Sequence, residues 1–151
     1  MHIEIDDLSR PTLHDLLNAH LQSMRTLSPP GSVHALVLNR LRQPDITFWP
    51  TWQNTVLLGC GALRQLDGHH GEVKSMRTPQ ACRRRGAGRA ILRHIIGVAR
   101  SRGYVRLSLE TGTAATFQPA QRLYQSAGFV FSGPFGAYVE DPHNVFMTLK
   151  L

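Results

Sequence analysis

Four arginines and two glycines lie within the seven residues from Arg83 to Arg89, between a strand-like stretch and a helix-like stretch. Gly86 and Gly88 lack Cβ atoms, so backbone N–H groups at the turn into the helix can approach an anion. The helix dipole and the guanidinium groups add to the attraction. This stretch therefore predicts a pyrophosphate cradle. Its expected members are Arg83, Arg84, Arg85, Gly86, Ala87, Gly88 and Arg89.

Two common phosphate-binding patterns do not account for this stretch. A P-loop needs Lys and then Ser or Thr after its second glycine, and neither follows Gly88. The dinucleotide fingerprint needs a third glycine, which Arg89 and Ala90 do not supply. The pattern that remains is R-x-x-G-x-G, from Arg83 to Gly88.

The elements that must position this turn follow from hydrophobic periodicity and turn residues. Alternation at Ile3 and Ile5 predicts a first strand, and the spacing of leucines from Leu13 to Leu21 predicts a helix. A second, shorter helix is expected over 33–41. Further strands are expected over 46–49, 55–66, 72–78, 105–109, 129–132 and 145–149, with helices over 86–102 and 119–127.

The expected order is β-α-α-β-β-β-α-β-α-β-β. Strands that are close in sequence pair most easily as an antiparallel meander. The sequence therefore predicts an α/β (α+β mixed) fold, with a mixed, mostly antiparallel central sheet flanked by helices. A chain of 151 residues is most simply one domain, over residues 1–151.

Charge limits the class of partner. The chain has 17 basic and 10 acidic residues, a net charge of +7, and the basic excess is concentrated between Arg77 and Arg106. No Phe, Trp or Tyr lies between Arg77 and Tyr104, whereas single-stranded nucleic acids bind to stacking aromatics among basic residues. A compact anion fits this clustering best, and a basic nucleic-acid-binding domain is the weaker alternative.

Membrane, disulfide and metal signals are weak. No apolar run approaches the roughly 20 residues of a membrane helix, and the acidic start is unlike a signal peptide, so we expect a cytoplasmic location. Cys60 and Cys82 form no disulfide framework. A zinc deaminase signature starting at His70 is incomplete, because Pro79 is not adjacent to Cys82 and Arg85 replaces the second thiolate. No metal is expected.

A second motif, Tyr124-Gln125-Ser126-Ala127-Gly128-Phe129, has the form Y-x-x-x-G-F. Together with the arginine-glycine turn and the element order, it resembles the GNAT superfamily of acyl-CoA-dependent N-acetyltransferases. The resemblance implies a single GNAT domain, acetyl-CoA as co-substrate, and direct attack on it by a small-molecule or peptide amine. It implies neither a nucleic-acid nor a membrane partner, and a homodimer stays an open alternative. A non-catalytic acyl-CoA sensor on the same fold is the main rival.

The resemblance also implies roles for single residues. The backbone of Met76, Arg77 and Thr78 would bind the pantetheine arm, with the Met76 N–H as donor to the developing oxyanion. Tyr124 would protonate the leaving thiolate, which suits a reference pKa of about 10. Glu72 would be the general base through water, about 13 Å from Met76 at ~3.3 Å per residue. Each of these two side chains has a purely structural alternative, as a packed helix-end aromatic or a solvated carboxylate.

Several positions stay open. Glu110 and His70 are reserve bases, and Phe117 stands where many members of the superfamily have a cofactor-binding Asn. The resemblance places the acceptor beside residues 29–34, the aromatic residues Phe48, Trp49 and Trp52, and residues 135–138. Core packing explains Phe48 and Trp49 equally well. Glu140 and Asp141 are candidates to attract a cationic amine.

Overall fold

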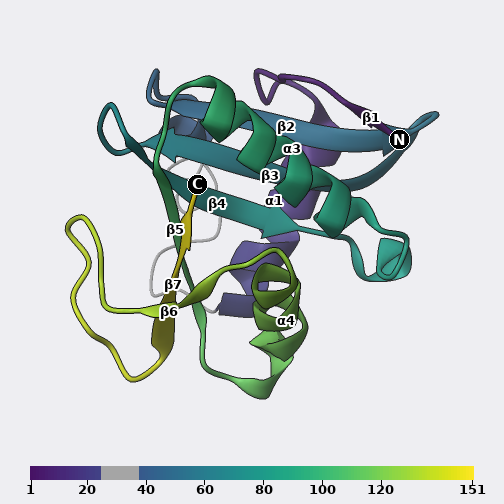
Figure 1. The fold of residues 1–151 in the computed structure, drawn as a ribbon. Coiled ribbons are helices and arrows are strands. Elements are labelled where there is room, and N and C mark those ends of the chain that lie inside the picture. Colours follow the sequence, from purple (N-terminus) through teal and green to yellow (C-terminus); the bar gives the residue numbers. More distant parts are fainter. Residues whose placement is uncertain (25–37) are drawn as a thin grey trace. The chain divides into compact units, whose positions relative to one another are not determined.

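A computed structural model of the chain describes residues 1–24 and 38–151 (Figure 1). Its strands are β1 (His2–Ile3), β2 (Ile46–Gln53), β3 (Val56–Gln65), β4 (His70–Arg77), β5 (Arg106–Gly112), β6 (Val130–Ser132) and β7 (Asn144–Lys150). Its helices are α1 (Pro11–Met24), α3 (Ala87–Ser101) and α4 (Gln118–Ser126), with 3₁₀ turns η1 (Gln80–Cys82) and η2 (Ala115–Phe117). Residues 38–41 are helical, and the rest of the helix expected over 33–41 lies outside the described residues.

The strands form a seven-stranded sheet in the order β1-β2-β3-β4-β5-β7-β6. β4 and β5 are parallel, and the pairs β1–β2, β5–β7 and β6–β7 are antiparallel (Figure 1). The predicted mixed, mostly antiparallel α/β fold is therefore confirmed.

Within this sheet the chain forms two compact units. Unit 1 comprises Met1–Ala62 and Ser75–Ile91, and unit 2 comprises Leu63–Lys74 and Leu92–Leu151. The boundaries fall inside β3, β4 and α3, so each of these elements contributes to both units. The predicted pyrophosphate cradle belongs to unit 1, whereas Glu72 and Tyr124 belong to unit 2.

Unit 1 is held by a hydrophobic cluster that includes Leu13 and Leu17 of α1 together with Phe48 and Trp52 of β2. Phe48 and Trp49 are each only 2% exposed, which favours the core interpretation of these aromatic residues over an acceptor wall. β2 also continues through Pro50, where the predicted strand ended. The short β1 pairs with Thr51 and Trp52 only, so the missing N–H of Pro50 removes none of these contacts.

Unit 2 buries one side of α3 and the alternate residues of β5. Leu92, Ile95 and Ala99 of the helix and Leu107 and Leu109 of the strand are at most 1% exposed. Gly103, with φ 81°, ends α3 in the left-handed conformation that helix C-caps favour, and the Tyr104 N–H donates back to the Ala99 carbonyl. The helix face and strand alternation expected from the sequence are both present.

Candidate active site

The arginine-glycine turn has the geometry of a helix N-terminus that is open to an anion. The first helical hydrogen bond of α3 joins the Ala90 N–H to the Gly86 carbonyl at 3.0 Å, so the N–H groups of residues 87–89 have no acceptor inside the helix. Gly86 has φ 82° and Arg84 has φ 66°. The side chains of Arg84, Arg85 and Arg89 are exposed. The pyrophosphate cradle over Arg83 to Arg89 stays a prediction.

Both ends of this turn are anchored. Cys82 before it and Ala87 after it form a buried cluster with Leu58 of β3, and the Cys82 thiol contacts the Leu57 carbonyl at 3.7 Å. Cys82 is thus a packing residue at the base of the loop. Anchoring at two points holds the exposed backbone between them in one conformation, which lowers the ordering cost of ligand binding.

The end of β4 departs from a regular strand. Ser75 has φ 55°, an uncommon value for a residue with a side chain, and its carbonyl accepts from the Cys60 thiol at 3.3 Å. Ser75 sets the direction of the next peptide, which carries the Met76 N–H. Strict alternation does not hold across such a residue, so alternation does not place the Met76 side chain on the same strand face as Glu72 and Lys74.

Two further contacts define this strand end. The Met76 carbonyl accepts from the Arg77 guanidinium (Nη1) at 2.8 Å. Gly59 of β3 lies so close to β4 that a Cβ there would be 2.8 Å from the Arg77 carbonyl oxygen. Burial raises the pKa of Cys60 to about 12, so this thiol is no nucleophile at neutral pH.

In unit 2, Glu72 is a buried carboxylate at the point where parallel pairing ends. β4 pairs with β5 from His70 to Glu72, and Glu72 lies opposite Ser108. The Glu72 side chain is 2% exposed. Tyr138 Oη donates to Glu72 Oε2 at 2.6 Å, and Lys74 Nζ lies 3.4 Å from the same oxygen. The solvated-carboxylate alternative for Glu72 is therefore wrong.

An aromatic cluster packs against the Tyr138 ring. The Tyr138 ring centroid lies 5.0 Å from that of Phe135 and 5.7 Å from that of Phe146, and Phe135 also contacts His70 at 6.0 Å. These are edge or tilted contacts, which aromatic rings prefer. The expected acceptor wall at residues 135–138 is thus a packed aromatic surface in contact with the predicted base. Residues 29–34 lie outside the described residues.

The two reserve bases, His70 and Glu110, each make a hydrogen-bonding contact with a neighbouring strand. His70 Nε2 lies 2.6 Å from the Ser108 hydroxyl, and burial lowers the pKa of His70. Burial raises the pKa of Glu110, and the negative charges of Glu72 and Asp141 add to that rise. The Glu110 carboxylate accepts from the Asn144 amide at 3.2 Å, so it is fixed against β7.

Tyr124 lies near the end of α4, 7% exposed, with its ring 5.9 Å from the Phe129 ring. Its carbonyl accepts from the Phe129 N–H at 3.1 Å, and Gly128 has φ 103° between them. The glycine and aromatic of Y-x-x-x-G-F thus end the helix and pack on the tyrosine. Phe117, at the position of the superfamily's Asn, lies against Gly112, where a Cβ would collide with its ring.

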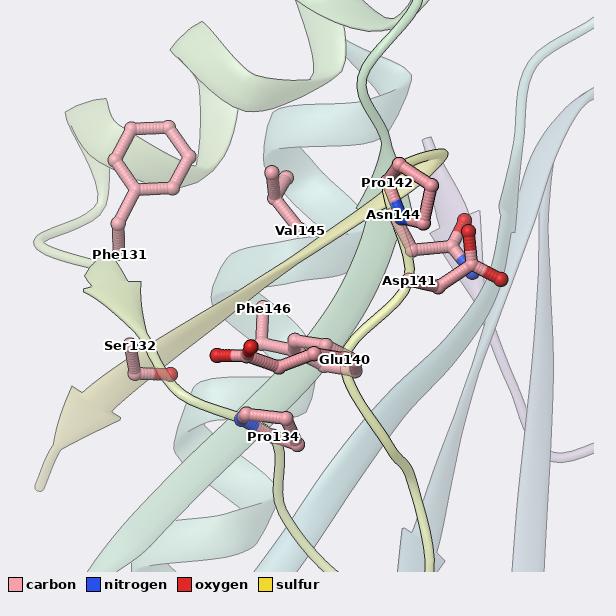
Figure 2. Close-up of a pocket in the computed structure, with 9 residues that line it drawn as sticks. All are labelled: Phe131, Ser132, Pro134, Glu140, Asp141, Pro142, Asn144, Val145 and Phe146. Atoms are coloured by element: carbon pink, nitrogen blue, oxygen red, sulfur yellow. The ribbon is translucent and has the colours of Figure 1, made fainter.

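An open pocket of about 520 Å³ lies between the ends of β6 and β7 and the connecting segment 133–143 (Figure 2). The apolar residues that line it are Phe131, Pro134, Pro142, Val145 and Phe146. The polar residues that line it are Ser132, Glu140, Asp141 and Asn144. In Figure 2 the Glu140 carboxylate points toward the Ser132 side of the pocket, and Asp141 points the other way. Asp141 Oδ1 accepts from the His143 N–H at 2.7 Å, which stabilises the turn there.

Sequence reasoning found Glu72 and Tyr138 separately but missed their hydrogen bond. The two residues are far apart in the chain, and only the pairing of β5 with β7 brings the segment after β6 back toward β4. Arg64 was also missed, and its Nη1 lies 3.8 Å from Glu72 Oε1. Within residues 1–24 and 38–151, neither a cluster of metal-binding side chains nor a helix able to span a membrane is present.

Comparisons with known proteins agree with this architecture. The model of the Acetyltransferase (GNAT) family matches residues 13–129. The chain is 55% identical to the uncharacterised N-acetyltransferase YsnE of Bacillus subtilis over all of both chains. It is 48% identical to the uncharacterised N-acetyltransferase YedL of Escherichia coli, over 99% of this chain and 94% of that one.

The fold is also that of solved acetyltransferases. A GNAT family acetyltransferase from Elizabethkingia anophelis with acetyl-CoA bound superimposes with a TM-score of 0.71 at 20% identity, over 99% of this chain and 97% of that one. The family match and the two N-acetyltransferase relatives define the chain as an acyltransferase. The chain belongs to the acetyltransferase (GNAT) family.

Proposed function

We propose that the protein transfers the acetyl group of acetyl-CoA to a primary amine by direct attack in a ternary complex. The anchored arginine-glycine turn carries this proposal, since it offers helix N–H groups and guanidinium groups to a pyrophosphate. We also propose that both units form one GNAT domain, because the family match over 13–129 takes in parts of each. Unpaired Cys60 and Cys82 fit a reducing compartment, and the proposed location is the cytoplasm.

The proposed chemistry assigns one task to each group. The amine nitrogen attacks the thioester carbonyl, its new C–N bond forms, and the C–S bond breaks. The Met76 N–H donates to the oxyanion, with Met76, Arg77 and Thr78 binding the pantetheine arm. Glu72 first accepts one proton from the substrate ammonium through water, which leaves a neutral amine. As the C–S bond breaks, Tyr124 protonates the departing thiolate, and the proton lost by the new amide nitrogen returns to the tyrosinate through solvent. Each proton and each bond is thereby accounted for.

The proposed acceptor is a cationic amine that carries an apolar group. Its support is the pocket in Figure 2, where the Glu140 carboxylate lies among phenylalanine and proline side chains. Phe146 lines this pocket and also contacts Tyr138, which donates to Glu72. The pocket and the base are therefore connected through the rings of Phe146 and Tyr138.

Glu72→Gln tests the base. The neutral amide cannot accept the proton, so we expect turnover with acetyl-CoA to fall about a hundredfold near pH 7. The loss should shrink at high pH, where the amine is already deprotonated. The measurement is the rate of CoA thiol release against pH. Equal profiles for the variant and the parent would remove Glu72 as base.

Glu140→Gln tests the acceptor pocket. Removing an exposed charge that attracts the ammonium group should raise KM for amines several-fold, with kcat nearly unchanged. Asp67→Asn is the matched control, because it removes an exposed carboxylate that accepts from the His69 N–H but does not line the pocket. An equal increase in KM with Asp67→Asn and Glu140→Gln would contradict the assignment.

A further inference from the structure

The two oxygens of the Glu72 carboxylate lie in different surroundings. Oε2 accepts from the Tyr138 hydroxyl at 2.6 Å and lies 3.4 Å from Lys74 Nζ. Oε1 is buried and has no hydrogen-bond partner within the described part of the chain, and Arg64 Nη1 lies 3.8 Å from it. Buried polar atoms are normally hydrogen-bonded, so the state of Oε1 calls for a reason.

Tyr138 is a donor fixed in place. Its ring packs against Phe135 and Phe146, and Lys74 Nζ lies 3.4 Å from its hydroxyl. Burial, together with the hydrogen bond to Glu72 and its charge, raises the pKa of Tyr138 well above its usual range. The phenol therefore keeps its proton at neutral pH, donates it to Oε2, and is unsuited to act as an acid itself.

We infer that Tyr138 is the positioning residue for the general base: its hydrogen bond to Oε2 fixes the orientation of the Glu72 carboxylate that receives the substrate proton. This inference rests on the proposed function, because it assigns Glu72 as the base. The proton leaves the substrate ammonium before the C–N bond forms, passes through water, and ends on the Glu72 carboxylate. A charge-assisted hydrogen bond of this length constrains the carboxylate strongly.

Other charges act on the same carboxylate from several elements. Lys74 lies on its own strand and Arg64 on β3, and both are in ion-pair range. Glu110 on β5 and His70 at the start of β4 interact with Glu72 through their charges. A substitution at Tyr138 leaves the charges of all four groups in place, and of the four only Lys74 contacts the hydroxyl that is removed.

The test uses Tyr138→Phe, which removes the hydroxyl and keeps the ring. We expect kcat/KM for the amine to fall about tenfold, mostly in kcat, with the acid limb of the pH profile moved to higher pH. Tyr104→Phe is the matched control. Tyr104 is a buried tyrosine of the same unit whose hydroxyl has no hydrogen-bond partner among the described residues, so that variant should keep its rate within about twofold.

A double-substitution cycle decides whether Tyr138 acts through Glu72. If it does, adding Tyr138→Phe to Glu72→Gln changes the rate no further, because the base is already absent. The same tenfold loss in both backgrounds, or an unshifted pH profile, would overturn the inference and leave the proposed function intact. If Glu72→Gln alone is without effect, the base assignment fails first. Equal melting temperatures for the single variants exclude misfolding as the cause.

Discussion

At the scale of single residues, burial explains why Glu72 needs its neighbours. A carboxylate removed from water is costly unless it is paired and hydrogen-bonded. Arg64, Lys74 and Tyr138 supply charge and one short hydrogen bond, yet Oε1 has no hydrogen-bond partner among the described residues. Such incomplete satisfaction is typical of groups kept for chemistry rather than for stability.

Tyr124 gives a second prediction at this scale. Tyr124→Phe keeps the edge contact with Phe129 but removes the proposed proton donor, so thiol release should slow by about a hundredfold. Binding of acetyl-CoA, measured by calorimetry, should stay within about threefold because the chemical step alone is affected. An unchanged rate at every pH would show that the residue only packs against the helix end.

The sequence indicated some of these residues more clearly than others. Tyr124 and the arginine-glycine turn were found because each belongs to a short local motif whose spacing has a physical meaning. Glu72 was found as an acidic residue on a strand, but its burial and its bond to Tyr138 depend on contacts between distant segments. Pairing of that kind has no local signal, so the sequence alone could not predict it.

At the scale of elements, the close approach of β3 and β4 at Gly59 supports the donor side. Gly59→Ala would place a Cβ 2.8 Å from the Arg77 carbonyl oxygen, and a backbone atom cannot move aside easily. We expect a loss of about 1–3 kcal/mol in unfolding free energy and roughly tenfold weaker acetyl-CoA binding. Denaturant unfolding and calorimetry measure the two effects.

Gly97→Ala is the control for that substitution. Gly97 lies on the exposed face of α3, with no atom near the position of an added Cβ. Alanine there should raise the unfolding free energy by about 0.5–1 kcal/mol and leave acetyl-CoA binding unchanged. If both variants weaken binding equally, the effect is not specific to the contact between β3 and β4.

Element boundaries show where periodicity is informative. The helices α3 and α4 lie within a few residues of the predicted ranges, because apolar spacing and a terminal glycine act together. The strand expected to include Ile5 ends at Ile3, and Ile5 is 69% exposed. Ser75 interrupts β4 with a left-handed φ that alternation cannot reveal, since the residue type does not require it.

At the scale of the whole molecule, the net charge of +7 favours anionic ligands in general. Because acetyl-CoA carries a pyrophosphate and a 3′-phosphate, its dissociation constant should rise several-fold between low and high salt. A CoA analogue without the 3′-phosphate should show a shallower dependence. Tight binding to random DNA with a steep salt slope would instead support the nucleic-acid alternative.

Amine-dependent release of CoA thiol from acetyl-CoA, measured across a library of cationic amines, tests the central claim most directly. The structure predicts that thiol appears only when acetyl-CoA and an amine are both present, with an N-acetylated product in equal amount. Amines with an apolar group should be the best acceptors, given the mixed acidic and aromatic pocket. Acetyl-CoA binding without amine-dependent thiol release would contradict the enzyme and favour the sensor.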